Sequence, residues 1–245
     1  MRELKAILER DVILPLQEPD LYRKYKVDLP NGILLYGPPG CGKTFIARAL
    51  GKRISYEFIE VMPSDLASTY VHGTQEKIGK LFKKAEESAP AILFFDELDA
   101  LVPDRSGHDV HYHYAAEVNE FLVQLNECSK RRILVIGATN LVRKVDPAIK
   151  RPGRLDKHIF VGPPDIEARV DAIKLYMRER PQDEIDWLTV ADAAENYSFA
   201  ELEYVVNEAA RAALVHRRNI TTTDLLLTVL EQNPPQPKGS RMDFE

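Results

Sequence analysis

The feature that most constrains this chain is a segment rich in glycine and proline that fits the pattern G-x-x-x-x-G-K-[ST]. It reads Gly37-Pro38-Pro39-Gly40-Cys41-Gly42-Lys43-Thr44, and it lies between a short apolar run at 33–36 and a helical pattern at 45–52. Glycines allow backbone N–H groups to surround phosphate oxygens at the start of a helix. Lys43 can reach the β- and γ-phosphates of a nucleotide, and the Thr44 hydroxyl can bind Mg²⁺. The segment therefore predicts a phosphate-binding loop between a buried strand and a helix.

A pair of carboxylates supplies the second signal. Asp96 and Glu97 directly follow the apolar run 91–95, and ligands of open α/β sheets bind at the carboxyl ends of strands. Two acidic residues after a strand are, by themselves, as consistent with a helix cap as with a catalytic site. Because this pair belongs to the same predicted sheet as the phosphate loop, we interpret it as catalytic. Asp96 would hold Mg²⁺ through its water shell, and Glu97 would orient and polarise the attacking water. For Asp99 we favour a charge at the start of the next helix.

A third buried run, 133–136, leads to the segment Gly-Ala-Thr-Asn, which ends at Asn140. Its amide could reach the γ-phosphate or the attacking water. An isolated asparagine in this position is usually a turn residue. With the other two motifs in the same sheet, we interpret Asn140 as a residue that senses the nucleotide.

The order of the expected elements indicates two domains. Strands alternate with helices up to Gly162, which predicts a mostly parallel sheet covered by helices. After the prolines that follow Gly162, only helical patterns remain, at 166–179, 187–195, 199–217 and 222–231. We expect a large α/β domain at 1–162, a small all-helical domain at 163–232 and a disordered, proline-rich tail at 233–245.

Composition narrows the class of protein. The 33 Lys and Arg residues against 38 Asp and Glu residues give a net charge of −5, so no basic excess points to nucleic acid or anionic lipid. The two cysteines cannot form a disulfide framework, and the charged start of the chain does not resemble a signal peptide. The apolar runs are too short to span a bilayer. We expect a cytoplasmic protein with no membrane segment in this chain and no nucleic-acid partner.

The motifs together resemble a known family. The order GPPGCGKT, ILFFDELD, GATN and then KRPGRLD at 150–156 is similar to an AAA+ ATPase module. The subgroup most similar contains protein unfoldases, microtubule-severing enzymes and membrane-bound AAA proteases. The resemblance runs from about residue 3 to residue 231. It implies the P-loop NTPase fold, a three-layer α/β/α parallel sheet followed by a small helical lid, with ATP and Mg²⁺ as cofactors.

The resemblance also implies roles for individual residues. Asp96 and Glu97 match the carboxylates that hold Mg²⁺ and activate water, and Asn140 matches the family's sensor. Arg151 and Arg154 match arginine fingers, which would act on ATP held by the next subunit of a ring, a homo-hexamer or a mixed ring. The full set of expected nucleotide-binding residues is Gly37, Pro38, Pro39, Gly40, Cys41, Gly42, Lys43, Thr44, Phe45 and Ala200, with Thr44 and Asp96 at the metal.

Two segments depart from the family pattern. The family's pore loop carries an aromatic residue two positions before a glycine, whereas here Tyr70 lies three positions before Gly73. We expect substrate contact from the segment Tyr70, Val71 and His72, with Tyr70 favoured over Val71 as the gripping residue. The lid signature has Phe199 where the family has glycine. This phenylalanine could stack on the base or crowd it.

The function that the resemblance implies is ATP-driven remodelling of proteins. A ring would hydrolyse ATP and unfold or translocate a protein substrate through its central pore, directly or through an adaptor. The alternative is an ATP-dependent assembly switch or scaffold that moves no substrate. The acid pair and both arginines favour hydrolysis. The irregular pore loop is the reason that the assembly switch remains the alternative.

Overall fold

The computed structural model describes residues 2–66, 73–105, 112–126 and 128–232. The chain forms two compact units. Among the described residues, the α/β unit contains 2–37 and 43–161, and the helical unit contains 162–232 together with the loop residues Pro38–Gly42. Among the described residues, no helix combines the length and the apolarity needed to cross a bilayer.

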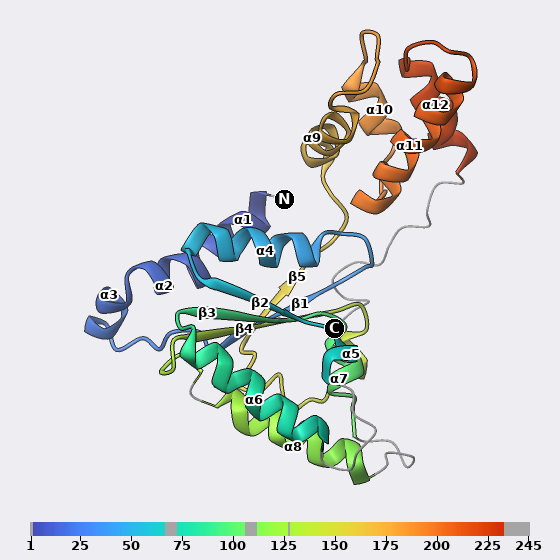
Figure 1. Cartoon of the computed structure of the whole chain (residues 1–245). Coiled ribbons are helices and arrows are strands. Elements are labelled where there is room, and N and C mark those ends of the chain that lie inside the picture. Colours follow the sequence, from blue (N-terminus) through green and yellow to red (C-terminus); the bar gives the residue numbers. More distant parts are fainter. Residues whose placement is uncertain (1, 67–72, 106–111, 127, 233–245) are drawn as a thin grey trace. The chain divides into compact units, whose positions relative to one another are not determined.

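The α/β unit is built on a five-stranded parallel sheet, with the strands in the order β2-β3-β4-β1-β5 (Figure 1). The strands are β1 (Gly32–Tyr36), β2 (Glu57–Val61), β3 (Ala91–Phe95), β4 (Ile133–Thr139) and β5 (Lys157–Phe160). Every residue of β1, β3 and β4 is buried. This burial explains their uninterrupted apolar sequences, because both faces of a covered parallel sheet exclude water. The predicted fold class, a parallel sheet with helices around it, is confirmed.

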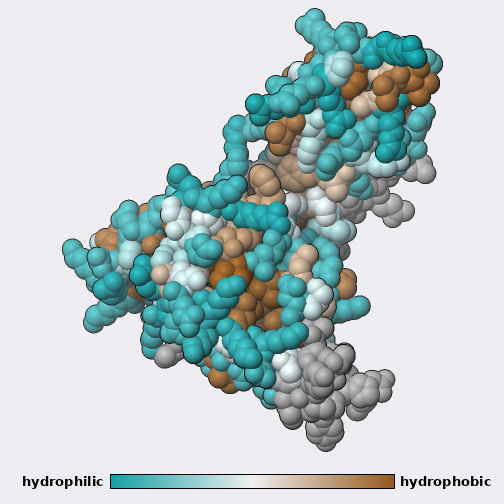
Figure 2. Space-filling view, in the orientation of Figure 1, coloured by the Kyte–Doolittle hydropathy of each residue, from teal (hydrophilic) through white to brown (hydrophobic). Residues whose placement is uncertain are grey.

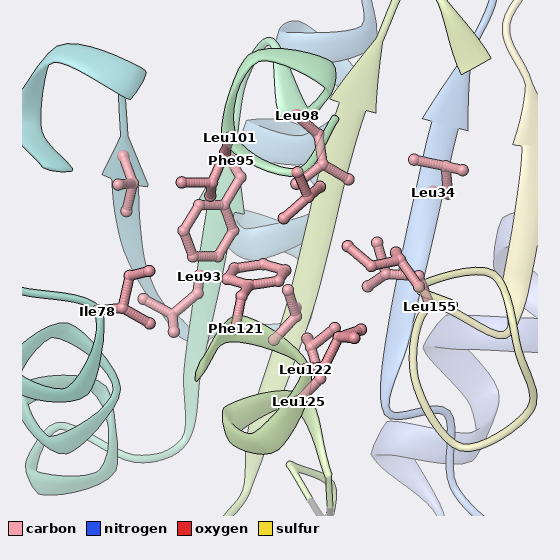
Figure 3. Close-up of a cluster of buried hydrophobic side chains, with 14 of the residues drawn as sticks. Leu34, Ile78, Leu93, Phe95, Leu98, Leu101, Phe121, Leu122, Leu125 and Leu155 are labelled. Carbon is pink, nitrogen blue, oxygen red and sulfur yellow. The ribbon is translucent and has the colours of Figure 1, made fainter. Parts of the chain in front are cut away.

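Helices cover both faces of this sheet (Figure 1). The long ones are α4 (Lys43–Ile54), α6 (Gly73–Glu87) and α8 (Tyr112–Leu125), and the short ones are α5 (Pro63–Leu66), α7 (Leu98–Leu101) and the 3₁₀ turn η2 (Val142–Lys144). The helices α6 and α8 pack against each other and close the main core, in which the rings of Phe95 and Phe121 meet edge to face with centroids 4.9 Å apart (Figure 3). This core holds the carboxyl end of β3 in place.

Two parts of the α/β unit differ from the sequence-based expectation. The helical spacing of Leu4, Ile7, Leu8 and Val12 predicts a helix over 3–14. The structure has a longer run made of α1 (Arg2–Leu8), the π-helical turn η1 (Glu9–Ile13) and α2 (Leu14–Gln17), followed by α3 (Pro19–Lys24). The strand β5 was not predicted. Its four residues are two polar ones, Lys157 and His158, followed by the apolar Ile159 and Phe160, and the strand pairs with β1 at the edge of the sheet. So short an edge strand has neither a long apolar run nor a clear alternation to reveal it.

The helical unit consists of α9 (Ile166–Met177), α10 (Trp187–Ala193), α11 (Phe199–Val215) and α12 (Thr222–Glu231). Each helix begins at the predicted residue, because a capping side chain precedes it: Asp165, Asp186, Ser198 and Thr221 each accept a hydrogen bond from a backbone N–H of the first turn. The unit has a core of its own. Its surface also carries apolar side chains among hydrophilic ones (Figure 2), including Leu214, Val215 and Leu230.

Candidate functional site

The predicted phosphate loop leaves β1 through three glycines with positive φ angles. Gly37, Gly40 and Gly42 have φ angles of 141°, 72° and 88°, all in the region that side chains disfavour. A Cβ at Gly37 would lie 2.4 Å from the carbonyl oxygen of Val161. The loop therefore requires glycine at these positions, and α4 begins directly after it at Lys43.

The Lys43 side chain is buried and connects two strands. Its Nζ donates to the carbonyl oxygen of Gly37 at 2.9 Å and to Oδ1 of Asn140 at 2.6 Å. Lys43 and Asn140 are 97 positions apart in the chain, and they meet because β1 and β4 are neighbours in the sheet. The sensing asparagine and the phosphate-binding lysine predicted from the sequence are thus in direct contact.

The residues expected at the metal also meet. The Thr44 hydroxyl donates to Oδ2 of Asp96 at 2.8 Å, and the N–H of Glu97 donates to Oδ1 of the same carboxylate at 2.9 Å. Asp96 follows β3 and Thr44 lies in the first turn of α4. A hydroxyl oxygen and a carboxylate oxygen are ligands that suit Mg²⁺. The donor set therefore fits a magnesium ion at this edge of the sheet.

Glu97 occupies an unusual backbone conformation. Its torsions, φ 49° and ψ 47°, are left-handed, and it is the N-cap residue of α7. A residue with a side chain adopts this conformation at a cost of about 1–3 kcal/mol, and such residues cluster at functional sites. The side chain is exposed, so the carboxylate beside Asp96 is accessible to water.

The two arginines lie on the segment between β4 and β5. Arg151 is exposed, whereas Arg154 is partly buried and donates from Nη1 to the carbonyl oxygen of Ala148 at 2.6 Å. Asn31 anchors the same segment, because its Nδ2 donates to the carbonyl oxygen of Gly153 at 2.8 Å. Burial raises the pKa of the neighbouring Asp156 carboxyl, although backbone N–H groups and Lys157 favour its charged form.

The remaining predicted residues fall into three groups. Phe45, in the first turn of α4, is 73% exposed. Within the helical unit, the N–H of Ala200 donates to the carbonyl oxygen of Gly40 at 3.4 Å, and Cys41 is buried with its Sγ contacting the carbonyl oxygen of Pro39. The proposed pore-loop residues Tyr70, Val71 and His72 lie outside the described residues.

Sequence reasoning missed two residues that organise this site. Asn31 was not singled out, although it directly precedes the glycine of β1. Asp99 was interpreted as a charge at the start of a helix, but its Oδ1 accepts a hydrogen bond from the Thr139 hydroxyl at 2.5 Å. The sequence positions of Asp99 and Thr139 could have identified this pair, because Asp99 lies two residues after Glu97 and Thr139 lies directly before Asn140.

Comparison with known proteins gives consistent matches. The model of the ATPase family associated with various cellular activities (AAA) matches residues 33–163, more than half of the chain. The chain is 36% identical over 230 residues to the ATPase family gene 2 protein of Saccharomyces cerevisiae. The matched region covers 91% of this chain and 29% of the yeast protein. The chain is 37% identical over 216 residues to a cell division cycle protein 48 homolog of Archaeoglobus fulgidus, covering 87% and 30%.

A third relative is the proteasome-activating nucleotidase of Pyrococcus abyssi. The identity is 36% over 237 residues, covering 95% of this chain and 58% of that protein. The chain therefore spans less than two thirds of the length of each of these relatives.

Proposed function

From the premise that this chain belongs to the AAA family of ATPases, we propose that it hydrolyses ATP in a ring of subunits and uses the energy to unfold or translocate proteins. Membership of the family confirms the resemblance and the ATPase activity expected from the motifs. The ring, the pore and the protein substrate are the proposed part. The nucleotide site rests on the contacts Lys43–Asn140 and Thr44–Asp96 at one edge of the sheet, and the observation that carries the proposed ring is the exposed Arg151 on the segment before β5.

The chain's own residues provide each part of a phosphoryl-transfer site. Backbone N–H groups of the loop would bind phosphate oxygens, and Lys43 would exchange its present acceptors for the β- and γ-phosphates. Thr44 and Asp96 would hold Mg²⁺, which neutralises charge on the phosphates when bound. The exposed Glu97 carboxylate would orient the attacking water, and the Asn140 amide would contact the γ-phosphate or that water.

The arginines support a site completed by a neighbouring subunit. Arg151 is exposed on the segment before β5, so its guanidinium is accessible to a second copy of the chain. An arginine supplied by a neighbour can be worth about 10³–10⁵ in rate, because it stabilises charge that develops on the transferring phosphoryl group. Exposed apolar side chains on α11 and α12 provide surface of the kind that subunit interfaces bury.

The protein substrate is proposed from the relatives. The match to a proteasome-activating nucleotidase covers 95% of this chain at 36% identity, and the name of that relative says that it activates the proteasome. We infer that the present chain acts on polypeptides, directly or through an adaptor. Both cysteines are buried thiols outside any disulfide, which suits a reducing compartment such as the cytoplasm.

The first test is ATP turnover per protomer as the protein concentration is raised through the micromolar range. We expect turnover per protomer to increase with concentration, because a neighbour would complete the site. Glu97→Gln should retain ATP binding and lose turnover, because an amide cannot polarise the attacking water. Turnover is measured as phosphate release, and binding is measured by equilibrium titration.

Two outcomes would contradict parts of the proposal. Turnover of Glu97→Gln at the wild-type rate would show that Glu97 does not activate water. Nucleotide binding without turnover in the unmodified chain at any concentration would instead favour the assembly switch. Glu184→Gln is the matched control, since it makes the same change at an exposed position in the helical unit.

A further inference from the structure

The Thr139 hydroxyl makes two hydrogen bonds at the end of β4. Thr139 is 1% exposed, and its Oγ1 donates to Oδ1 of Asp99 at 2.5 Å while it accepts from the N–H of Leu141 at 2.9 Å. A hydroxyl has one proton to donate, so the bond to Asp99 fixes the rotation of this group and directs a lone pair to Leu141. Asn140 is the residue that these two bonds enclose.

Asp99 is held on a rigid element. It lies in the first turn of α7, which follows Glu97 directly. The helix packs closely on β4, because a Cβ at Gly137 would come within 2.5 Å of the Leu98 side chain. The carboxylate of Asp99 is therefore placed by packing of its own helix against the strand that leads to Asn140.

The other end of this arrangement is the phosphate-binding lysine. Asn140 accepts from Nζ of Lys43 at 2.6 Å. A continuous path thus runs from Asp99 through Thr139 and the backbone of Asn140 to Lys43. The same four-residue helix has Glu97 as its N-cap, so one element connects the two residues expected to handle the attacking water.

A charge at a helix start would not need this geometry. The helix α7 has only one turn of aligned peptide dipoles, and its N-cap residue makes no side-chain capping bond. The Asp99 carboxylate instead bonds a side chain 40 positions away on a neighbouring strand. We propose that Asp99 is a positioning residue for ATP hydrolysis, which holds the Asn140 side chain in place through Thr139. This inference rests on the proposed function and deepens it.

The test compares four variants of the full chain, Asp99→Ala, Asp99→Asn, Thr139→Val and Thr139→Ser, by kcat at saturating ATP and by the Kd of ADP. Asp99→Ala and Thr139→Val should each lower kcat by about 10- to 100-fold, the upper figure being the cost of misplacing a catalytic group by about 1 Å. The Kd of ADP should stay close to that of the unmodified chain, because the γ-phosphate is absent from ADP.

Rescue and coupling separate positioning from folding. Thr139→Ser keeps the hydroxyl and Asp99→Asn keeps an acceptor oxygen, so both should retain more turnover than the variants that remove the bond. The double variant Asp99→Ala with Thr139→Val should be no slower than the slower single variant, because both remove the same interaction. Multiplying losses, or unchanged kcat in both single variants, would overturn the inference.

A second aspartate–threonine pair provides the control. Thr189 donates from its hydroxyl to Oδ2 of Asp186 at 2.6 Å, on the surface of the helical unit. Asp186→Ala and Thr189→Val should leave kcat unchanged. If the unmodified chain and these controls hydrolyse ATP while Lys43→Ala does not, ATP hydrolysis at the proposed site stands, and normal turnover in Asp99→Ala then contradicts the positioning role alone. No turnover in the unmodified chain would overturn both proposals.

Discussion

At the scale of single residues, the site depends on side chains whose polar groups have defined partners. The Lys43 ammonium is largely buried and donates to Gly37 and Asn140. A buried charge without such acceptors would cost several kcal/mol. These bonds keep the lysine beside the loop, in the position where phosphate oxygens would replace its present acceptors.

Replacing this lysine gives the first prediction at this scale. Lys43→Ala should weaken ATP binding by at least about tenfold, since one charge-assisted hydrogen bond is worth about 1.5–3 kcal/mol and each 1.4 kcal/mol is tenfold in affinity. The measurement is an equilibrium titration with ATP. Lys52→Ala is the matched control, because Lys52 is exposed in the last turn of the same helix α4. Equal affinities for both variants would exclude Lys43 from the site.

At the scale of elements, side-chain caps decide where the helices of the helical unit begin. At the start of α12, Thr221 and Asp224 form a capping box, and Arg218 donates to both oxygens of Asp224 at 2.5 and 2.6 Å. The Arg218 guanidinium is the largest cause that holds the pKa of Asp224 far below its usual range. The carboxylate therefore stays charged in the folded protein at pH values where a free aspartate is neutral.

This arrangement predicts a pH-dependent effect of Asp224→Asn. The folded-state pKa of Asp224 lies below its unfolded value of about 3.9, so its stabilisation is complete above that value and is lost as the pH falls toward the folded-state pKa. The variant should lower the unfolding midpoint at pH 7 by about 4–8 °C, which corresponds to roughly 1 kcal/mol in a unit of this size. The difference should persist down to about pH 4 and shrink below it.

Thermal unfolding followed by circular dichroism provides the measurement. Asp192→Asn is the control, because Asp192 is an exposed carboxylate on α10 and its replacement should leave the midpoint unchanged. A difference between the unmodified chain and Asp224→Asn that grows on acidification would contradict the predicted sign.

At the scale of the whole molecule, the α/β unit carries the contacts among Lys43, Thr44, Asp96 and Asn140, and it also carries the exposed Arg151. The Arg154 guanidinium donates to Ala148, and the neighbouring Gly153 carbonyl accepts from Asn31, so both are held within the same subunit. We therefore propose that Arg151, rather than Arg154, reaches across a subunit boundary in the proposed ring.

Mixing two inactive variants tests this division. Arg151→Ala should bind ATP and hydrolyse it slowly, by a factor within about 10³–10⁵, while Lys43→Ala should not bind it. In mixed rings, a Lys43→Ala subunit would supply Arg151 to the intact nucleotide site of its neighbour, so part of the ATP turnover should return. Arg143→Ala, which removes an exposed arginine nearby, should retain activity alone. Proven co-assembly without any recovery of phosphate release would contradict an arginine acting between subunits.

Local patterns in the amino-acid sequence are enough to predict the parallel sheet and the order of the motifs. Uninterrupted apolar runs identify β1, β3 and β4, since strands covered on both faces need no polar residues, and capping residues mark the starts of α9 to α12. The loop from Gly37 to Thr44 can be recognised in the sequence as well, because its positive φ angles call for glycines at a fixed spacing. These features are local, so a single chain pattern contains them.

Which side chains meet depends on how the strands and helices pack in three dimensions. The bonds from Lys43 to Asn140 and from Thr139 to Asp99 join residues 97 and 40 positions apart, and they exist because β4 lies between β1 and β3. The short edge strand β5 and the anchoring of Gly153 by Asn31 likewise depend on pairing with distant segments. Strand order is set by packing of the whole sheet, so no local pattern specifies these contacts.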